Sequence, residues 1–437
     1  MILMNLFPKW VDYSIAFILL SCFSVVLYFR IFKKLSLFAL ILQFLFQIIY
    51  LLEYYNIIKL NTSLEGLDED SQDYIRRKAL QGLSKRELAV VRWMELLNGK
   101  PEPHPDIDDY FVDKTKSREA IVADITNLRH TSPESPHVLL AGPYYNPTEK
   151  IDFRKESVPE DTLPRLESLY FDFGSKARRR RTDHKRRVCL LHFHGGCYLL
   201  GSARACQVHE LMCAKHGYHL LGVEYTMYPF RPIEDAVEEA FDAFKWLVHE
   251  KHMEEIYLIG ESSGAHLGLL LAEKISRIVV DDMKDETNKL YRSALKGAIL
   301  LSPWMNLTMR ETEGINDIDH QDRSLTNRII RMWKNNGVPC GFNERQRAKS
   351  LSPCFWPLET IQALKEVLPK GIFISYSERE RFADEIEMFI EKLKHCDFKS
   401  VTIQVEKIPF HAFHMLRDLL PEHYKRAENG IVNLIEH

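Results

Sequence analysis

A serine in the surroundings of a nucleophile stands beyond the middle of the sequence. The segment Gly260-Glu-Ser262-Ser-Gly264 follows the apolar run at residues 256–259 and precedes a helical pattern at residues 265–279. A sharp turn from strand to helix needs small flanking residues and leaves the serine hydroxyl exposed above the sheet. The next helix points its amino terminus at the site, where developing negative charge is favoured. This context predicts that Ser262 attacks an electrophilic carbon such as an ester carbonyl.

A glycine-rich turn could supply the donors that such a reaction needs. His194-Gly195-Gly196-Cys197 follows another apolar run, at residues 188–193. Acyl transfer forms a tetrahedral oxyanion, for which each preorganised N–H donor is worth roughly 2.7–4 kcal/mol. We expect the amides of Gly195, Gly196 and Ser263 to form this oxyanion hole, with His194 as part of the motif. The alternative for His-Gly-Gly alone is a simple tight turn.

Together these motifs resemble those of the hormone-sensitive-lipase family of α/β hydrolases, which includes arylacetamide deacetylase and the yeast steryl acetyl hydrolases. His194-Gly195-Gly196 is similar to the family's HGGG, and residues 260–264 are similar to its GDSAG. Val223-Glu-Tyr225 resembles VDYR, and Leu301-Ser-Pro-Trp304 resembles LSPW. The likeness covers residues 188–415.

Two positions depart from the family pattern. Cys197 replaces the third glycine, although its amide donor remains. Met227-Tyr-Pro229-Phe230 keeps only the proline of the family's Leu-Ala-Pro-Glu segment. The resemblance still implies an α/β-hydrolase fold with a helical cap.

The resemblance also implies an acid and a base. Glu380 stands where the family's Gly-Glu-x-Asp-x-Leu-x-Asp segment has its triad aspartate, and Ser377 replaces the usual glycine. Asp384 is the rival acid, with a first-turn helix acid as its other interpretation. His411-Ala-Phe resembles the family's His-Gly-Phe, which favours His411 over His414 as the base. The histidine would take the serine proton and deliver it to the leaving alcohol.

Apolar β-rich runs alternate with helical patterns from residue 188 onward. This alternation predicts a mainly parallel sheet with helices on both faces, as the α/β-hydrolase fold requires. We expect strands at residues 188–193, 219–223, 256–259, 298–301, 372–376 and 401–405, and helices at residues 232–249, 265–279 and 384–393.

The amino terminus contains two long apolar runs, at residues 10–29 and 35–52. About 20 helical residues cross a hydrocarbon core of ~30 Å. We therefore expect a membrane anchor at residues 1–59 with one or two transmembrane helices. A cleavable signal peptide is the alternative, but no clear small-residue cleavage site follows the first run.

Cations between the two runs, Arg30, Lys33 and Lys34, predict the orientation. Cationic flanks favour the cytosol. A hairpin, or a span by the second run alone, then places the rest of the chain in the lumen, whereas a span by the first run alone keeps it cytosolic. We expect an endoplasmic reticulum membrane protein with a lumenal catalytic domain. Asn61 and Asn306 begin Asn-x-Ser/Thr triplets and are glycosylation candidates.

We expect a helical or cap region at residues 60–150 and a catalytic domain at residues 151–437 with a cap insertion at about 303–357. Ser84-Lys-Arg-Glu87 has the form of a capping box ahead of the apolar run at residues 88–97. Two interpretations of the apolar side chains in the insertion stay open, a lid over the site or ordinary packing. These side chains are Met305, Leu307, Trp333, Phe355 and Trp356.

Composition excludes several other classes. A net charge of -3 gives no general attraction to nucleic acid. The eight cysteines lack metal-ligand spacing, so we expect neither a metal nor another cofactor, and mostly buried free thiols such as Cys189. The cationic cluster at residues 176–187 is interpreted as a solvated loop between strands rather than a nuclear import signal.

The expected function is a membrane-anchored serine ester hydrolase that deacetylates hydrophobic esters such as steryl acetates. The anticipated partners are a hydrophobic ester and the bilayer, with no nucleic acid and no obligatory protein partner. The alternatives are a general carboxylesterase or acylglycerol lipase, and a catalytically inactive interaction protein. Retention of the serine, acid, histidine and glycines argues against the inactive form.

Overall fold

A computed structural model describes residues 46–50, 52, 80–98, 145–153, 167–174, 186–227, 232–282, 284–308, 345–398, 400–408 and 410–437. Most of the predicted anchor lies outside these residues, as do Asn61, Trp333 and residues 176–185 of the cationic cluster. Among the helices of the described ranges, none is long and apolar enough to cross a bilayer.

The core is an eight-stranded sheet in the order β1-β2-β4-β3-β5-β6-β7-β8. Strands β3 to β8 are parallel, as predicted, whereas β2 pairs antiparallel with β4 and β1 antiparallel with β2. All six predicted strands are present, and β1 and β2 are additional. The strands are β1 (Glu149–Ile151), β2 (Ser168–Phe171), β3 (Val188–Phe193), β4 (His219–Val223), β5 (Glu255–Glu261), β6 (Leu295–Leu301), β7 (Gly371–Ser377) and β8 (Val401–Glu406).

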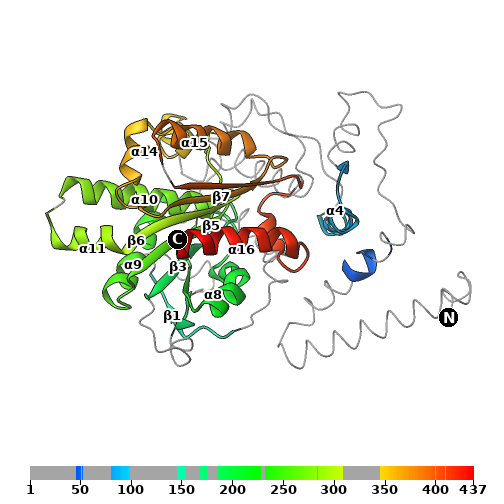
Figure 1. The fold of residues 1–437 in the computed structure, drawn as a ribbon, viewed down its shortest axis with the longest axis horizontal. Coiled ribbons are helices and arrows are strands. Elements are labelled where there is room, and N and C mark those ends of the chain that lie inside the picture. The colour runs from blue at the N-terminus through cyan, green and yellow to red at the C-terminus, as the bar shows by residue number, and fades with distance from the viewer. Residues whose placement is uncertain are drawn as a thin grey trace, which may run out of the picture.

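Helices cover both faces of the sheet (Figure 1). In β3, Cys189, Leu191 and Phe193 join one apolar cluster, while Val188 and Leu190 join the other. This two-residue alternation follows from the strand pleat and explains why the buried strands are apolar throughout. One face is covered by α9 (Ile233–His249), α10 (Ser263–Asp281), α11 (Glu286–Ala294), α14 (Leu358–Leu364) and α15 (Ala383–His395), and the other by α8 (Glu210–His216) and α16 (Pro421–Glu436).

Helix α4 (Lys85–Asn98) begins with the predicted capping box. The Ser84 amide donates to Glu87 Oε2 over 2.5 Å, and the Glu87 amide donates to Ser84 Oγ over 3.3 Å. Each side chain therefore satisfies an amide that the first helical turn leaves without a partner. Figure 1 shows α4 beside the chain that leads into α16.

The described ends of the predicted cap insertion pack into the core. Met305, Leu307 and Trp356 are buried in the cluster around α10 and α15. For these residues the structure favours ordinary packing over a lid. The cysteines at 189, 197, 206, 213, 354 and 396 are free thiols, five of them buried, as predicted.

Candidate active site

Ser262 lies in the strained turn between β5 and α10, with φ 55° and ψ -120°. A Cβ on Gly264 would lie 2.0 Å from the Phe193 carbonyl oxygen, and one on Gly260 would lie 2.5 Å from the Gly264 carbonyl carbon. Backbone atoms at these distances cannot yield, so the turn requires both glycines. Ser262 is only 5% exposed, which places it in a covered site rather than on the open surface.

Glu261, the residue before the serine, connects the elbow to the glycine-rich turn. Its Oε1 accepts the Gly195 amide over 2.8 Å, and its Oε2 lies 2.9 Å from His192 Nε2. The carboxylate is 4% exposed. This contact corrects the expectation for Gly195, because its amide donates to Glu261 instead of facing a reacting oxygen. Sequence reasoning missed this, since Glu261 was only the variable position of the motif.

His194 supports the turn rather than the reaction centre. Its Nδ1 lies 2.8 Å from the Gly195 carbonyl, and its ring stacks on Tyr225 at 4.2 Å between centroids. The Tyr225 hydroxyl donates to the His194 carbonyl over 2.6 Å. The resemblance of Val223-Glu-Tyr225 to a family motif thus corresponds to a physical support of the glycine-rich turn.

A second buried histidine fixes the same turn from α10. His266 Nε2 lies 2.7 Å from the Leu351 carbonyl, which can only accept, so Nε2 carries the proton. Burial lowers the pKa of His266 to about 4, so its Nδ1 accepts from the Tyr198 hydroxyl over 2.6 Å. Tyr198 has φ 59°, and this bond helps to hold that backbone conformation.

The predicted acid and base lie together. His411 Nδ1 is 3.5 Å from Glu380 Oε1, and both side chains are buried. Glu380 Oε2 accepts from the Ser302 hydroxyl over 2.6 Å and from the Ser377 amide over 3.3 Å. The loops that carry the three candidates follow β5, β7 and β8, so they meet at the carboxyl ends of parallel strands.

The two rivals occupy other environments. His414 Nε2 lies 2.8 Å from Ser375 Oγ, and burial lowers the pKa of His414 to about 3. A histidine that stays neutral down to about pH 3 and contacts a buried serine is suited to a structural role. Asp384 lies in the first turn of α15, half-buried, and its pKa is raised by burial and by Glu387.

Ser377, which replaces the family's glycine, connects the loop after β7, which carries Glu380, to the chain that follows β8. Its hydroxyl donates to the Ile408 carbonyl and accepts from the Arg379 amide. In the sequence Ser302 and Ser377 are only members of motifs, and no local signal indicates that Ser302 donates to Glu380.

Asn306 does not suit glycosylation. Its side chain is 0% exposed, and its Oδ1 accepts from the amide and the hydroxyl of Thr308. A glycan needs solvent around the asparagine nitrogen, so the folded structure contradicts this candidate.

Metal chemistry has no visible donor set in the described part of the chain, where no group of three or more His, Cys, Asp or Glu could hold a metal ion. The arrangement instead offers a serine at a strained turn, a buried histidine–carboxylate pair and the first amides of α10.

Comparison with known proteins adds independent findings. A family model described as alpha/beta hydrolase fold matches residues 190–415, more than half of the chain. Probable carboxylesterase 3 of Arabidopsis thaliana is 22% identical over 55% of this chain and 74% of its own length. Human hormone-sensitive lipase is 26% identical over 45% of this chain but only 17% of its own length.

Among solved structures, an esterase/lipase from an uncultured bacterium superposes with a TM-score of 0.50 at 16% identity, covering 81% of this chain and 99% of that one. At this identity the likeness bears on the fold alone. The family match, the motif order and the sheet agree: the chain belongs to the α/β-hydrolase family.

Proposed function

We propose that this protein is a serine ester hydrolase with Ser262 as nucleophile, His411 as general base and Glu380 as the acid that orients the histidine. The observation that carries the proposal is the buried contact between His411 and Glu380 at the same sheet end as the strained Ser262 turn. The ester-hydrolysing relatives support the same reaction class.

In the proposed mechanism, His411 Nε2 takes the Ser262 proton while Oγ attacks the ester carbonyl, and Glu380 stabilises the imidazolium through Nδ1. The tetrahedral oxyanion would accept hydrogen bonds from the amides of Gly196 and Ser263, since the Gly195 amide already donates to Glu261. The imidazolium then protonates the leaving alcohol. Water activated by the same histidine frees the acid and restores Ser262.

A fluorophosphonate probe tests the nucleophile directly. Wild-type protein should label, whereas Ser262→Ala and His411→Ala should not, because the probe reacts with an activated serine. Thermal unfolding of each variant controls for loss of fold. Equal labelling of the Ser262→Ala protein would exclude this mechanism.

For the substrate, we propose a hydrophobic ester, with steryl acetates as the leading class. The motif resemblance and the two apolar amino-terminal runs support a lipid-soluble substrate. The names of the carboxylesterase and lipase relatives support the alternative of a general carboxylesterase or acylglycerol lipase. Rates measured side by side on a sterol acetate and a triacylglycerol distinguish these proposals, since a steryl acetate hydrolase should prefer the sterol acetate. Lipid profiles of cells with active or Ser262→Ala protein would identify the substrate itself.

For location, we propose an endoplasmic reticulum membrane anchor with a lumenal catalytic domain. Because Asn306 is buried, an exposed acceptor is needed to test this. Asp285→Asn creates the triplet with Glu286 and Thr287 at the exposed start of α11, and asparagine also caps helices well. An endoglycosidase-sensitive mobility shift, lost on adding Thr287→Ala, is expected. Digestion of the catalytic domain by protease outside sealed microsomes would contradict the lumenal orientation.

A further inference from the structure

The chain between β8 and α16, residues 407–420, carries His411 and is here named the histidine loop. Its apolar side chains do not join the two clusters on the sheet faces. Most of them form a third cluster with α4 and with helical residues 46–50, while Met415 and Ala412 pack with Ala205, Val208 and Tyr424. The loop contributes Ile408, Phe410, Phe413, Leu416, Leu419 and Leu420, and the amino-terminal side contributes Phe46, Ile49, Leu80, Ala89, Val90 and Val91.

Both neighbours of the His411 turn are therefore covered by amino-terminal residues. Phe410 and Phe413 are fully buried in this third cluster. Without α4 this apolar surface would face water, at a cost of roughly 25 cal/mol per Å². Part of the packing around the histidine loop thus comes from a segment outside the matched family region, which begins at residue 190.

Arg86 adds a directed contact at the end of the loop. Its Nε donates to the Leu419 carbonyl over 2.5 Å, and its Nη2 donates to the Asp418 carbonyl over 3.1 Å. The guanidinium also lies over the rings of Phe46 and Tyr50, at 5.8 and 5.6 Å from the centroids. One side chain thereby joins the loop end, α4 and the preceding helical residues.

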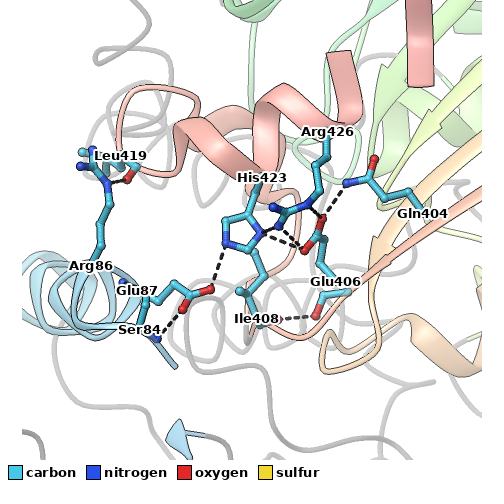
Figure 2. Close-up of polar contacts among 10 residues, drawn as sticks. Ser84, Arg86, Glu87, Gln404, Glu406, Ile408, Leu419, His423 and Arg426 are labelled. Carbon is cyan, nitrogen blue, oxygen red and sulfur yellow. Dashed lines mark hydrogen bonds and ion pairs between the residues drawn. The ribbon is translucent and has the colours of Figure 1, made fainter. Parts of the chain in front are cut away.

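Glu87 links α4 to α16 through its contact with His423. Figure 2 shows its carboxylate pointing at the His423 ring, with Glu406 and Arg426 on the other side of the imidazole. Glu87 Oε1 lies 2.9 Å from His423 Nε2, and Glu406 Oε2 lies 2.9 Å from His423 Nδ1. Arg426 donates to both oxygens of Glu406 over 2.7 Å.

These contacts bracket the histidine loop. Glu406 is the last residue of β8 and His423 lies in the first turn of α16, so their ion pair fastens both ends of the intervening chain. Glu87 holds that pair from outside while its other oxygen caps α4. A carboxylate on each imidazole nitrogen favours the imidazolium, in which both nitrogens donate, while the Arg426 guanidinium also lies 2.8 Å from Nδ1 and opposes that charge.

We propose that α4 is a positioning clamp for the catalytic histidine, in which Glu87, Arg86 and His423 fix the loop that carries His411. The proposal rests on the function assigned above to His411. None of the three residues touches the reacting atoms. They affect the rate by fixing the position of the His411 ring. An error of about 1 Å at a catalytic group can cost ~10²-fold in rate.

The charges of the clamp give it a defined pH range. Burial opposes the charged form of His423, but hydrogen bonds to Glu406 and Glu87 raise its pKa from 6.5 to about 9. Glu406 is likewise opposed by burial, yet His423 and Arg426 lower its pKa from 4.5 to about 2. The histidine contribution is complete below pH 6.5 and is lost as pH rises through 9, while the Glu406 contribution is complete above pH 4.5.

The test measures kcat and KM against pH for the full-length chain on a soluble ester. Glu87→Gln removes one of two carboxylates from His423, so the alkaline fall in kcat should move to lower pH. At pH 8.5 we expect kcat to be about tenfold lower with KM within twofold. Glu428→Gln is the matched control, because Glu428 lies on α16, pairs with Lys215 and Lys425, and has a side chain 13% exposed, as Glu87 has.

A role in packing alone would lower the unfolding midpoint without moving the pH profile. The clamp is therefore overturned if Glu87→Gln keeps the pH profile and the kcat of the wild type, as Glu428→Gln is expected to do. If Glu87→Gln does not fold, Arg86→Lys keeps the charge but loses the forked contact, and unchanged kcat there would overturn it too. Fluorophosphonate labelling of Ser262→Ala at the wild-type rate would instead overturn the proposed function.

Discussion

The two halves of the candidate site are held in place by different means. On the nucleophile side, β3 and β5 are paired strands, and the contacts of Gly264 with the Phe193 carbonyl and of Gly195 with Glu261 lie at the carboxyl ends of that pair. On the base side, the histidine loop leaves the edge strand β8 and is held by residues more than 330 positions earlier in the chain. The sheet therefore preforms the nucleophile turn, whereas in the proposed clamp the base relies on α4 as well as on the contacts of the loop with β7.

This difference has a consequence for cooperativity. Local opening of α4 would uncover one side of the histidine loop, which keeps its contacts with β7 through His414 and Ser377, and would leave the elbow intact, since α4 takes no part in the clusters on the sheet faces. Substitutions on the two sides should thus have different effects. Those on the nucleophile side should mainly lower the free energy of unfolding, and those on the base side should mainly lower kcat.

The largest effect is expected at the acid. Glu380→Gln should lower kcat by up to ~10⁴-fold, because the amide can hold the wrong histidine tautomer and cannot stabilise the imidazolium. Asp384→Asn, at a half-buried first-turn position, should change kcat by no more than about twofold. Steady-state kinetics with unfolding midpoints checks both. The reverse order would move the acid to Asp384.

On the nucleophile side, Glu261→Ala should destabilise the fold by about 2–5 kcal/mol, because it leaves the half-buried Gly195 amide and the buried His192 without their carboxylate. Glu255→Ala is the matched control, since Glu255 begins the same strand and is equally buried but pairs with the half-exposed Arg186. A loss of about 1 kcal/mol is expected there. Urea unfolding measures both, and equal losses would remove the special place of Glu261.

Ser302 connects the two sides, because it follows β6 and donates to Glu380. Ser302→Ala removes a charge-assisted hydrogen bond worth about 1.5–3 kcal/mol, so kcat should fall at least tenfold. Ser276→Ala, a buried serine in α10 that donates to the Glu273 carbonyl, provides the control. Equal kinetics for the two variants would mean that the Ser377 amide suffices to orient Glu380.

The same difference explains what the sequence could predict. The elbow, the glycine-rich turn and the six parallel strands are local patterns of small and apolar residues, and these patterns predict the elements near their observed bounds. The capping box at Ser84 and Glu87 is equally local. By contrast, the partner of the Gly195 amide and the burial of Asn306 depend on which chains lie side by side.

Long-range charge pairing was also beyond the sequence. Nothing near Glu87 indicates His423 as a partner, because surface carboxylates and histidines are common and usually solvated. The short strands β1 and β2 were missed because three or four residues are too few to show a period. Their antiparallel pairing extends the sheet without touching the site.

The smallest effect is expected at Ala412, which follows the catalytic histidine with φ 50° and ψ 38°. Ser262 also has a positive φ, but its strain cannot be relieved without losing the nucleophile. At position 412 the strain can be relieved, because the similar family motif His-Gly-Phe has glycine there. Ala412→Gly should raise the unfolding free energy by about 0.5–1 kcal/mol, because the left-handed conformation disfavours a β-carbon by more than the extra chain entropy of glycine. Because the clamp fixes the loop, kcat should stay within twofold; a clear fall in kcat with unchanged stability would show that residue 412, rather than α4, restrains His411.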